Sequence, residues 1–346
     1  MLRLTKTSRI LGFLGSLGLL VSCSPRVATS FWRIGTPADS TRAGYTVIHA
    51  EGKTRHCYPI TEWTDSIQPN YVGKGDTYHQ LHHHGVAVES EHMAYRIYFD
   101  KKQTIDPYCK RTPQLELAQS HWYPNDSLLA AGYGDDILRV SGTVGVGSVK
   151  YWNGQKMVHI EPVAERSQRI VSAKKDQATI EVAVKGWNPR SPRDPSIPSP
   201  LVNMTTRYTM LAGHRDMRCD VSLSEAVEGL CTGVQFIPAK SSAPRTPSDT
   251  SIIILPNGVL LASWGTDWPV NDSAKYAKET VGLAVFIPKA YAGALVHDKQ
   301  NNLCLLNGTS PHFYLTCVGA TKENHPVATN ATEWLIYLRR WAKHLR

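Results

Sequence analysis

Hydrophobic residues along this chain recur mainly in short runs, separated by Gly, Pro, Asn and Asp. Runs of this kind, rich in β-branched and aromatic residues, are typical of strands in an antiparallel sheet. They lie at 45–49, 95–99, 137–140, 157–160, 179–184, 207–211, 217–223, 252–255, 283–287 and 312–318. The pattern predicts an all-β protein built as a large antiparallel β-sandwich.

Helical periodicity is clear at the C-terminus. Apolar positions recur there in steps of three or four residues, with basic side chains between them. These positions are Trp334, Leu335, Leu338, Trp341 and Leu345. We expect a terminal helix that packs on the sandwich through this face.

The first 22 residues have the pattern of a secretory signal peptide. Arg3, Lys6 and Arg9 precede an apolar run of about a dozen residues, which is shorter than the roughly 20 that span a bilayer. The following Leu-Val-Ser-Cys resembles a bacterial lipobox, which makes Cys23 the expected lipidation site and a membrane anchor. The alternative is a secreted protein in which Cys23 is incidental.

This reading divides the chain into three parts. Residues 1–22 are the signal peptide, 23–43 a lipid-anchored tether and 44–346 a single β-sandwich domain. The protein is then expected to be an exported lipoprotein that faces the periplasm.

Charge and cysteine content limit the ligands and metal sites that the sequence predicts. Removal of the signal peptide lowers the formal net charge from +9 to +6, and a basic exported protein suits an acidic glycan, although such a charge is also ordinary for solubility. We find no arginine-rich arm, so nucleic acid is not an expected partner. Six cysteines remain after Cys23, in a compartment that permits disulfides. Their irregular spacing, without Cys-x-x-Cys, argues against structural zinc.

The densest polar chemistry lies in residues 82–100. If one strand runs from Gly85, alternation places Glu89 and Glu91 on one face with Tyr95, and Arg96 on the other. The Cβ atoms of the two glutamates would then be about 7 Å apart. This spacing suits an acid–base pair, two ligands to a cation, or a carboxylate that orients a histidine.

Three histidines open this segment, at the expected mouth of the strand. Consecutive side chains point in alternating directions, so at most two of them face one site. The candidate catalytic residues are His82, His83, His84, Glu89, Glu91 and Tyr95, and the candidate substrate-binding residues are Arg96, Asp106, Lys110 and Trp152. The alternative is a solvated hairpin with a histidine-rich tip.

No cofactor is indicated with certainty. Histidine and glutamate together could bind a divalent cation, but the sequence has no His-Glu-x-x-His motif. Trp122, Trp152 and Trp187 are the first candidates for platforms on which a sugar ring packs, although most tryptophans belong to the core.

Several blocks of the sequence resemble the domain of unknown function 4861 family. They are His82-His83-His84-Gly85, Glu89-Ser90-Glu91, residues 94–100, residues 103–106, Lys110, and the later blocks at 115–117, 134–138, 145–148 and 152–154. Cys109 stands where the family pattern has glycine. The resemblance implies an exported bacterial protein encoded among polysaccharide-degrading genes, often beside or fused to unsaturated glucuronyl hydrolases. It also implies a sandwich of the galactose-mutarotase or polysaccharide-lyase type, but fold analogy assigns no reaction.

The leading expectation is a lyase that cleaves a uronic-acid-containing glycan by β-elimination. One of the three histidines would be the base, Arg96 or Lys110 would neutralise the uronate carboxylate, and Tyr95 or Tyr98 would be the acid. Strand alternation separates Arg96 from Glu91, so these residues cannot all serve one site.

Three alternatives stay open. A glycoside hydrolase would use Glu89 and Glu91 as its two carboxylates. A non-catalytic glycan-binding lipoprotein would present an aromatic platform with no base in reach of the sugar. A sugar epimerase is the third.

Overall fold

The structure is a computed structural model that describes residues 28–29, 48–51, 56–59, 82–117, 119–120, 123–173, 176–189, 201–238 and 250–345. The expected signal peptide and Cys23 lie outside the described residues, as do most of the tether, Trp122 and the His82 side chain. Among the described residues, no helix is long and apolar enough to cross a membrane.

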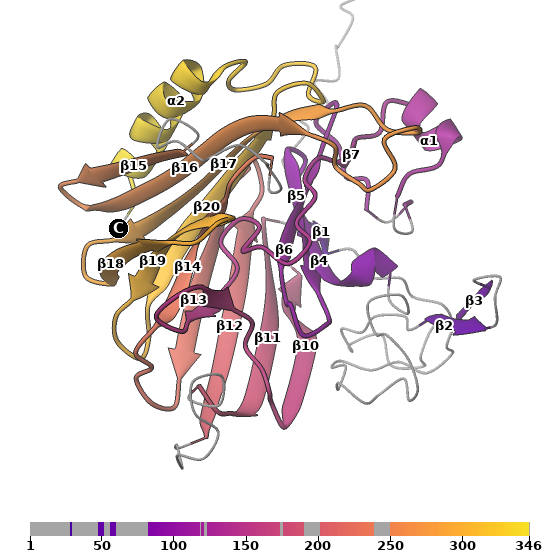
Figure 1. Cartoon of the computed structure of the whole chain (residues 1–346). Helices are drawn as coiled ribbons and strands as arrows, with labels where there is room; N and C mark the ends of the chain where they lie inside the picture. The colour runs from indigo at the N-terminus through magenta and orange to yellow at the C-terminus, as the bar shows by residue number, and fades with distance from the viewer. Residues whose placement is uncertain are drawn as a thin grey trace, which may run out of the picture.

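The strands form three antiparallel sheets and a hairpin (Figure 1). The amino-terminal sheet consists, in spatial order, of β1 (Ala28–Thr29), β4 (Gly85–Glu89), β5 (Met93–Tyr98), β6 (Ile105–Cys109) and β7 (Asp135–Asp136). The large sheet consists of β10 (Glu165–Ala173), β11 (Gln177–Trp187), β12 (Val202–Leu211), β13 (Met217–Leu223), β20 (His312–Gly319), β17 (Glu279–Pro288), β16 (Gly258–Asp267) and β15 (Thr250–Leu255).

The third sheet, here called the front sheet, consists of β18 (Ala292–His297), β19 (Asn301–Leu306), β14 (Leu230–Gln235), β8 (Lys150–Trp152) and β9 (Met157–Val158). The hairpin is β2 (Ile48–Glu51) with β3 (His56–Pro59). The helices in the described part of the chain are the short 3-10 helix η2 (His82–His84), α1 (Asp126–Ala130) and α2 (Ala331–Lys343).

The main core lies between the large sheet and the two five-stranded sheets. Strand β12 alternates buried and exposed positions along its length, as expected for a sheet with one face in the core. Val88, Tyr95 and Ile97 of the amino-terminal sheet enter this core beside residues of the large sheet. The Gln168 side chain of β10 joins the two layers, since it accepts from Val86 N at 2.7 Å and donates to the Ile97 carbonyl at 3.0 Å.

Helix α2 covers the opposite face of the large sheet (Figure 1). Trp334, Leu338 and Ala342 are its buried residues, and they pack on β16 and β17. Strand β17 is therefore buried on both faces, which explains its nearly continuous apolar sequence. The predicted all-β sandwich with a C-terminal helix is confirmed.

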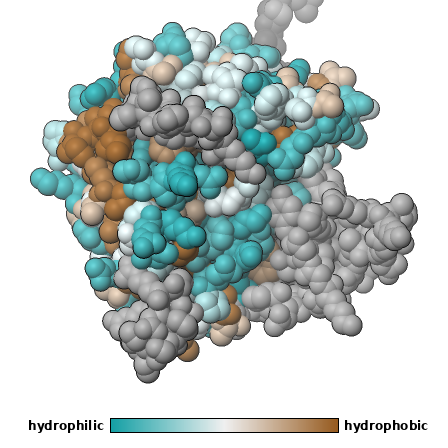
Figure 2. All heavy atoms as spheres, in the orientation of Figure 1, coloured by the Kyte–Doolittle hydropathy of each residue, from teal (hydrophilic) through white to brown (hydrophobic). Residues whose placement is uncertain are grey.

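Two local predictions are wrong. Residues 137–140 form no strand, and the segment from Gly85 to Phe99 is a hairpin of β4 and β5. Of the cysteines, the five with described side chains are all buried and free, so no disulfide joins them. Figure 2 shows an apolar patch over the edge strand β15, where the side chain of Ile254 is exposed, on a face that is otherwise largely hydrophilic.

Candidate active site

The turn between β4 and β5 decides which polar residues share a face. Strand β4 ends at Glu89 and β5 begins at Met93, with the Ser90 amide donating to the Met93 carbonyl at 2.9 Å. Because the chain reverses here, Glu89 lies opposite Ala94 and on the same face as Arg96. The expectation that Glu89 shares a face with Tyr95 and not with Arg96 is wrong, because it assumed an uninterrupted strand.

This outer face of the amino-terminal sheet points away from the sandwich core. Arg96 pairs across the sheet with Asp106, and Tyr108 pairs with Asp136 in the neighbouring row. Cross-strand neighbours on one face are within side-chain reach of each other. Register therefore brings together side chains that are up to 40 positions apart in sequence.

Arg96 is the centre of this arrangement. Its Nη2 donates to Asp106 Oδ2 and to Asp136 Oδ2, both at 2.6 Å, and the guanidinium is fully buried. The Tyr98 hydroxyl donates to the same oxygen of Asp106. The His84 ring meets Tyr98 edge-on, with centroids 5.5 Å apart. We call these five residues, Arg96, Asp106, Asp136, Tyr98 and His84, the Arg96 cluster.

Aromatic rings connect the cluster to the protein surface. The Arg96 Cζ lies 5.6 Å from the centroid of Tyr123, and His84 lies 6.4 Å from it. Tyr123 in turn lies 6.5 Å from Tyr276, and both tyrosines are only partly buried. These two rings therefore lie between the buried guanidinium and the protein surface.

The backbone beside the cluster is strained. His83 and His84 have φ angles of 53° and 60°, in the left-handed region that non-glycine residues seldom occupy. The following Gly85 is required, because a Cβ there would lie 2.2 Å from the Ile97 carbonyl oxygen. Strain of this kind costs about 1–3 kcal/mol per residue and clusters at functional sites. His83 is held by Nε2, which lies 2.9 Å from the Leu117 carbonyl oxygen.

The electrostatics of the cluster favour proton exchange. Burial and the neighbouring Asp136 raise the pKa of Asp106 to about 7. Burial also raises the pKa of Asp136, and it raises that of Asp135 to about 6. Burial disfavours the charged form of Arg96, but the two carboxylates outweigh this and raise its pKa. Arg96 is thus a permanent cation beside a carboxyl group that titrates near neutral pH.

One carboxylate oxygen of the cluster stands out. Asp106 Oδ1 is buried and has no hydrogen-bond partner among the described residues. An unpartnered buried oxygen costs about 1–3 kcal/mol, and such groups concentrate where a ligand or catalytic function uses them.

Lys110 and Glu89 form a separate buried pair. The Lys110 ammonium donates to Glu89 Oε2, and both side chains are almost completely buried. Glu89 also accepts from the amides of Glu116 and Leu117. The predicted sugar-binding lysine and catalytic glutamate are therefore engaged in holding the segment that covers the outer face.

The other predicted residues lie apart from the cluster. Tyr95 faces the sandwich core and donates to the Arg215 carbonyl at 2.6 Å, since it is one position out of phase with Arg96. Glu91 lies in the β4–β5 turn and accepts from Gly213 N at 3.1 Å. The two glutamates therefore do not flank one site. Trp152 belongs to the front sheet and is partly buried against its apolar residues.

Asp136, Tyr108 and Tyr123 were missed from the predicted site. Asp136 was within reach, because residues 134–138 form one of the blocks that resemble the family. The tyrosines carry no signal of their own, because cross-strand register decides their neighbours.

Cys109 fits its position in spite of its departure from the family pattern. Its side chain points into the core, where a Cβ on Gly319 would lie 2.7 Å from its Sγ. Lys110 and Cys109 therefore project to opposite faces of the sheet, and the thiol leaves the Lys110–Glu89 pair intact.

The fold and this site define an antiparallel sandwich with a buried arginine–carboxylate cluster. The chain belongs to the family described as Domain of unknown function (DUF4861), whose profile matches residues 36–346. Comparison with curated proteins gave no match. Among the described residues, no group of three or more His, Cys, Asp or Glu is arranged to hold a metal ion.

Proposed function

We propose that the chain is a carbohydrate-active enzyme that cleaves uronic-acid-containing glycans by β-elimination at the Arg96 cluster. The observation that supports this most is the Asp106 carboxyl, which contacts both a fixed cation and a phenol and has a pKa of about 7. β-Elimination needs a cation for the uronate carboxylate, a base for the α proton and an acid for the leaving oxygen. The cluster contains a group suited to each role.

Arg96 binds the substrate carboxylate in this proposal while Asp106 is protonated, since the guanidinium then faces only one other negative charge, that of Asp136. Its charge is fixed by two carboxylates, and Tyr123 covers its surface side. As the base removes the proton, charge moves onto the carboxylate, and a nearby cation stabilises that state more than the ground state.

His84 is the proposed base, and Tyr98 is the proposed acid. Within the run His82–His84, two side chains are described: His83 is directed to the Leu117 carbonyl, whereas His84 lies beside Tyr98. The base takes the α proton, the electron pair of the broken C–H bond forms the C=C bond, and the C–O bond breaks as Tyr98 protonates the leaving oxygen. Protonated Asp106 then returns a proton to Tyr98, which its pKa permits near neutral pH.

A glycan panel tests the reaction class. The mature chain is incubated with pectic, ulvan-like and glucuronate-capped glycans, with and without chelator. Ultraviolet absorbance reports the unsaturated uronate, and a reducing-end assay reports cleavage in general. Absorbance together with new ends is the expected result. New ends without absorbance would indicate a hydrolase, and no change in either would indicate a binding protein.

A further inference from the structure

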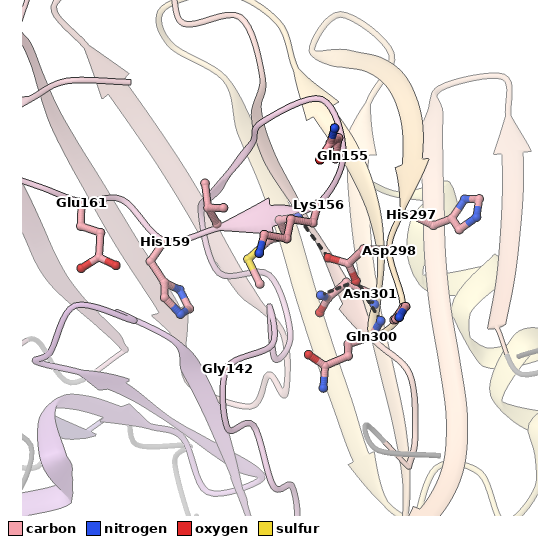
Figure 3. A pocket seen from close by; sticks show the side chains of 12 residues that line it. Gly142, Gln155, Lys156, His159, Glu161, His297, Asp298, Gln300 and Asn301 are labelled. Carbon is pink, nitrogen blue, oxygen red and sulfur yellow. Dashed lines mark hydrogen bonds between the residues drawn. The ribbon is translucent and has the colours of Figure 1, made fainter. Parts of the chain in front are cut away.

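A cavity of about 890 Å³ lies on the front sheet, away from the Arg96 cluster. Its volume is in the range that suits a small ligand. Its walls come from β9 and the turn before it, from the segment at 159–161, and from the turn between β18 and β19 (Figure 3). Figure 3 shows Lys156 and His159 on one wall, with Asp298, Gln300 and Asn301 on the other. Nine of the twelve residues that line the cavity are polar or charged.

The wall opposite His159 is held by Asp298. Its carboxylate accepts from the amides of Met157, Gln300 and Asn301 and from the Asn301 side chain, at 2.8–3.0 Å. Asn301 in turn accepts from Val144 N at 2.8 Å. The negative charge of Asp298 is thus compensated by backbone donors, and the wall is fixed before any ligand binds.

His159 forms the floor of the cavity, and a buried lysine lies behind its ring. Lys150 Nζ lies 3.4 Å from His159 Nδ1 and also donates to the Lys102 carbonyl and to Thr104 Oγ1. Three acceptors match the three protons of an ammonium group. A proton donated to Nδ1 leaves the neutral imidazole with its own proton on Nε2, so His159 can offer an N–H group to a ligand.

Cations predominate around this floor. Burial and the charges of Lys150, Lys102, Lys101 and Arg166 lower the pKa of His159 to about 3, so the ring stays neutral. Burial lowers the pKa of Lys150 to about 7, which a bound anion would oppose. Lys156 and Lys299 lie exposed in the lining, where their charges can meet a ligand. Of the acidic side chains in the lining, Glu161 lies on the His159 side of the cavity in Figure 3, where its charge acts on Arg166.

We infer that this cavity is a second binding site, which takes the acid group of an anionic saccharide, a carboxylate or a sulfate ester, on His159 and Lys156. The anion follows from the cations and the imidazole donor, whereas the saccharide rests on the proposed function. Lys150 acts from behind the imidazole as a positioning residue. The site lies in a different sheet from the Arg96 cluster, so it holds a part of the glycan that does not react.

Calorimetric titration of the mature chain tests the site. The probes are D-glucuronate, glucose 6-sulfate, inorganic sulfate and D-glucose. The two sugar acids should bind, and glucose should not. If inorganic sulfate binds as tightly as glucose 6-sulfate, the site recognises the anion alone. Binding by glucose equal to that of glucuronate would overturn the inference, as would the absence of binding by every anion.

Variants locate the site. Lys156→Gln removes an exposed cation and leaves the fold intact, and it should weaken glucuronate binding about tenfold or more. His159→Leu should do the same, and His159→Gln, which keeps a donor, should restore part of the affinity. Lys289→Gln, at the opposite end of β18, is the matched control and should bind like the wild type.

Asp106→Asn separates this inference from the proposed function. It should retain glucuronate binding that depends on Lys156 while losing elimination activity. If Lys156→Gln and His159→Leu bind glucuronate as the wild type does, the cavity is not the binding site. The elimination assay tests the reaction at the Arg96 cluster independently of this result.

Discussion

At the scale of single residues, the number of charges in the Arg96 cluster bears on which of its groups carries a proton. One guanidinium faces two carboxylates, Asp106 and Asp136, in a fully buried site. Two ionised carboxylates around one buried cation leave a negative excess, which favours protonation of one of them. Burial and, after it, the charge of Asp136 raise the pKa of Asp106, and the Tyr98 hydroxyl is the group that can use the proton.

The first prediction concerns Asp106→Asn, which removes the titrating proton and keeps the size of the side chain. Elimination should fall by about 100-fold or more, as for loss of a general acid–base group. In the wild type, activity should decline as pH rises through about 7, because the protonated form of Asp106 is lost. The pH dependence of the initial elimination rate measures both effects. Wild-type activity in the variant would remove Asp106 from the mechanism.

A second prediction concerns the Lys110–Glu89 pair. Lys110→Ala leaves a carboxylate buried without its cation and should lower the free energy of unfolding by about 3 to 5 kcal/mol. The double variant Lys110→Met with Glu89→Gln should recover much of this loss. Urea unfolding of the wild type, of Lys110→Ala and of the double variant measures the three free energies of unfolding. A stable Lys110→Ala protein with weakened substrate binding would instead indicate that Lys110 binds the substrate, as predicted from the sequence.

At the scale of elements, the packing of α2 accounts for the burial of β17 on both faces. Trp334 is almost completely buried over Gly282, where a Cβ would lie 2.8 Å from its ring. The neighbouring position Ile336 is about half exposed. One face of this helix therefore contributes to stability, and the other does not.

The third prediction compares these two positions. Trp334→Ala should lower the free energy of unfolding by about 3 to 5 kcal/mol through lost burial and the cavity it leaves. Ile336→Ala should change it by no more than about 0.5 kcal/mol. Thermal and urea unfolding report both values. Equal effects of the two substitutions would contradict the orientation of α2.

Secondary structure could be predicted where one face meets solvent and the other meets the core. Strand β12 and helix α2 show clear periodicity for that reason. Strand β14 is buried throughout and contains Gly233, so it has neither alternation nor high strand propensity. The β4–β5 turn has no Gly, Pro or Asn; the Ser90 hydroxyl makes it by accepting from His92 N at 3.1 Å. A turn built this way leaves little signal in the sequence.

The sequence predicted several residues of the candidate site, but it did not predict how they are arranged. His84, Arg96 and Asp106 were among the expected residues, and all three meet in the cluster. Their grouping with Asp136 depends on register between strands, which local sequence does not determine. The shift in phase at Ser90 also reversed the expected faces, so that Tyr95 leaves the site and Tyr98 enters it.

At the scale of the whole molecule, buried carboxyl groups make stability depend on pH. The pKa values of Asp106 and Asp135 are raised to about 7 and about 6. Between about pH 4 and these values, the native state holds protons that the unfolded chain has released. This contribution to the free energy of unfolding therefore falls as pH rises through that window.

The fourth prediction follows from this sign. Asp106→Asn cannot titrate, so its free energy of unfolding should fall less steeply than that of the wild type between pH 4 and 7. Urea unfolding at several pH values gives the two slopes. Parallel slopes would mean that the Asp106 pKa is not raised in the native state.

The sandwich as a whole separates two polar sites. The Arg96 cluster occupies the outer face of the amino-terminal sheet, and the cavity at His159 occupies the front sheet. The expected export and lipid anchor at Cys23 remain predictions, as does the likeness to mutarotase or lyase sandwiches.

The most direct test of the account compares Tyr98→Phe with Tyr95→Phe in the elimination assay. Both tyrosines are buried on β5, but only Tyr98 contacts Asp106, whereas Tyr95 donates to a backbone carbonyl on the core side. The account predicts that Tyr98→Phe loses the absorbance of unsaturated uronate while Tyr95→Phe retains it. Full activity of Tyr98→Phe, or loss of activity confined to Tyr95→Phe, would contradict it.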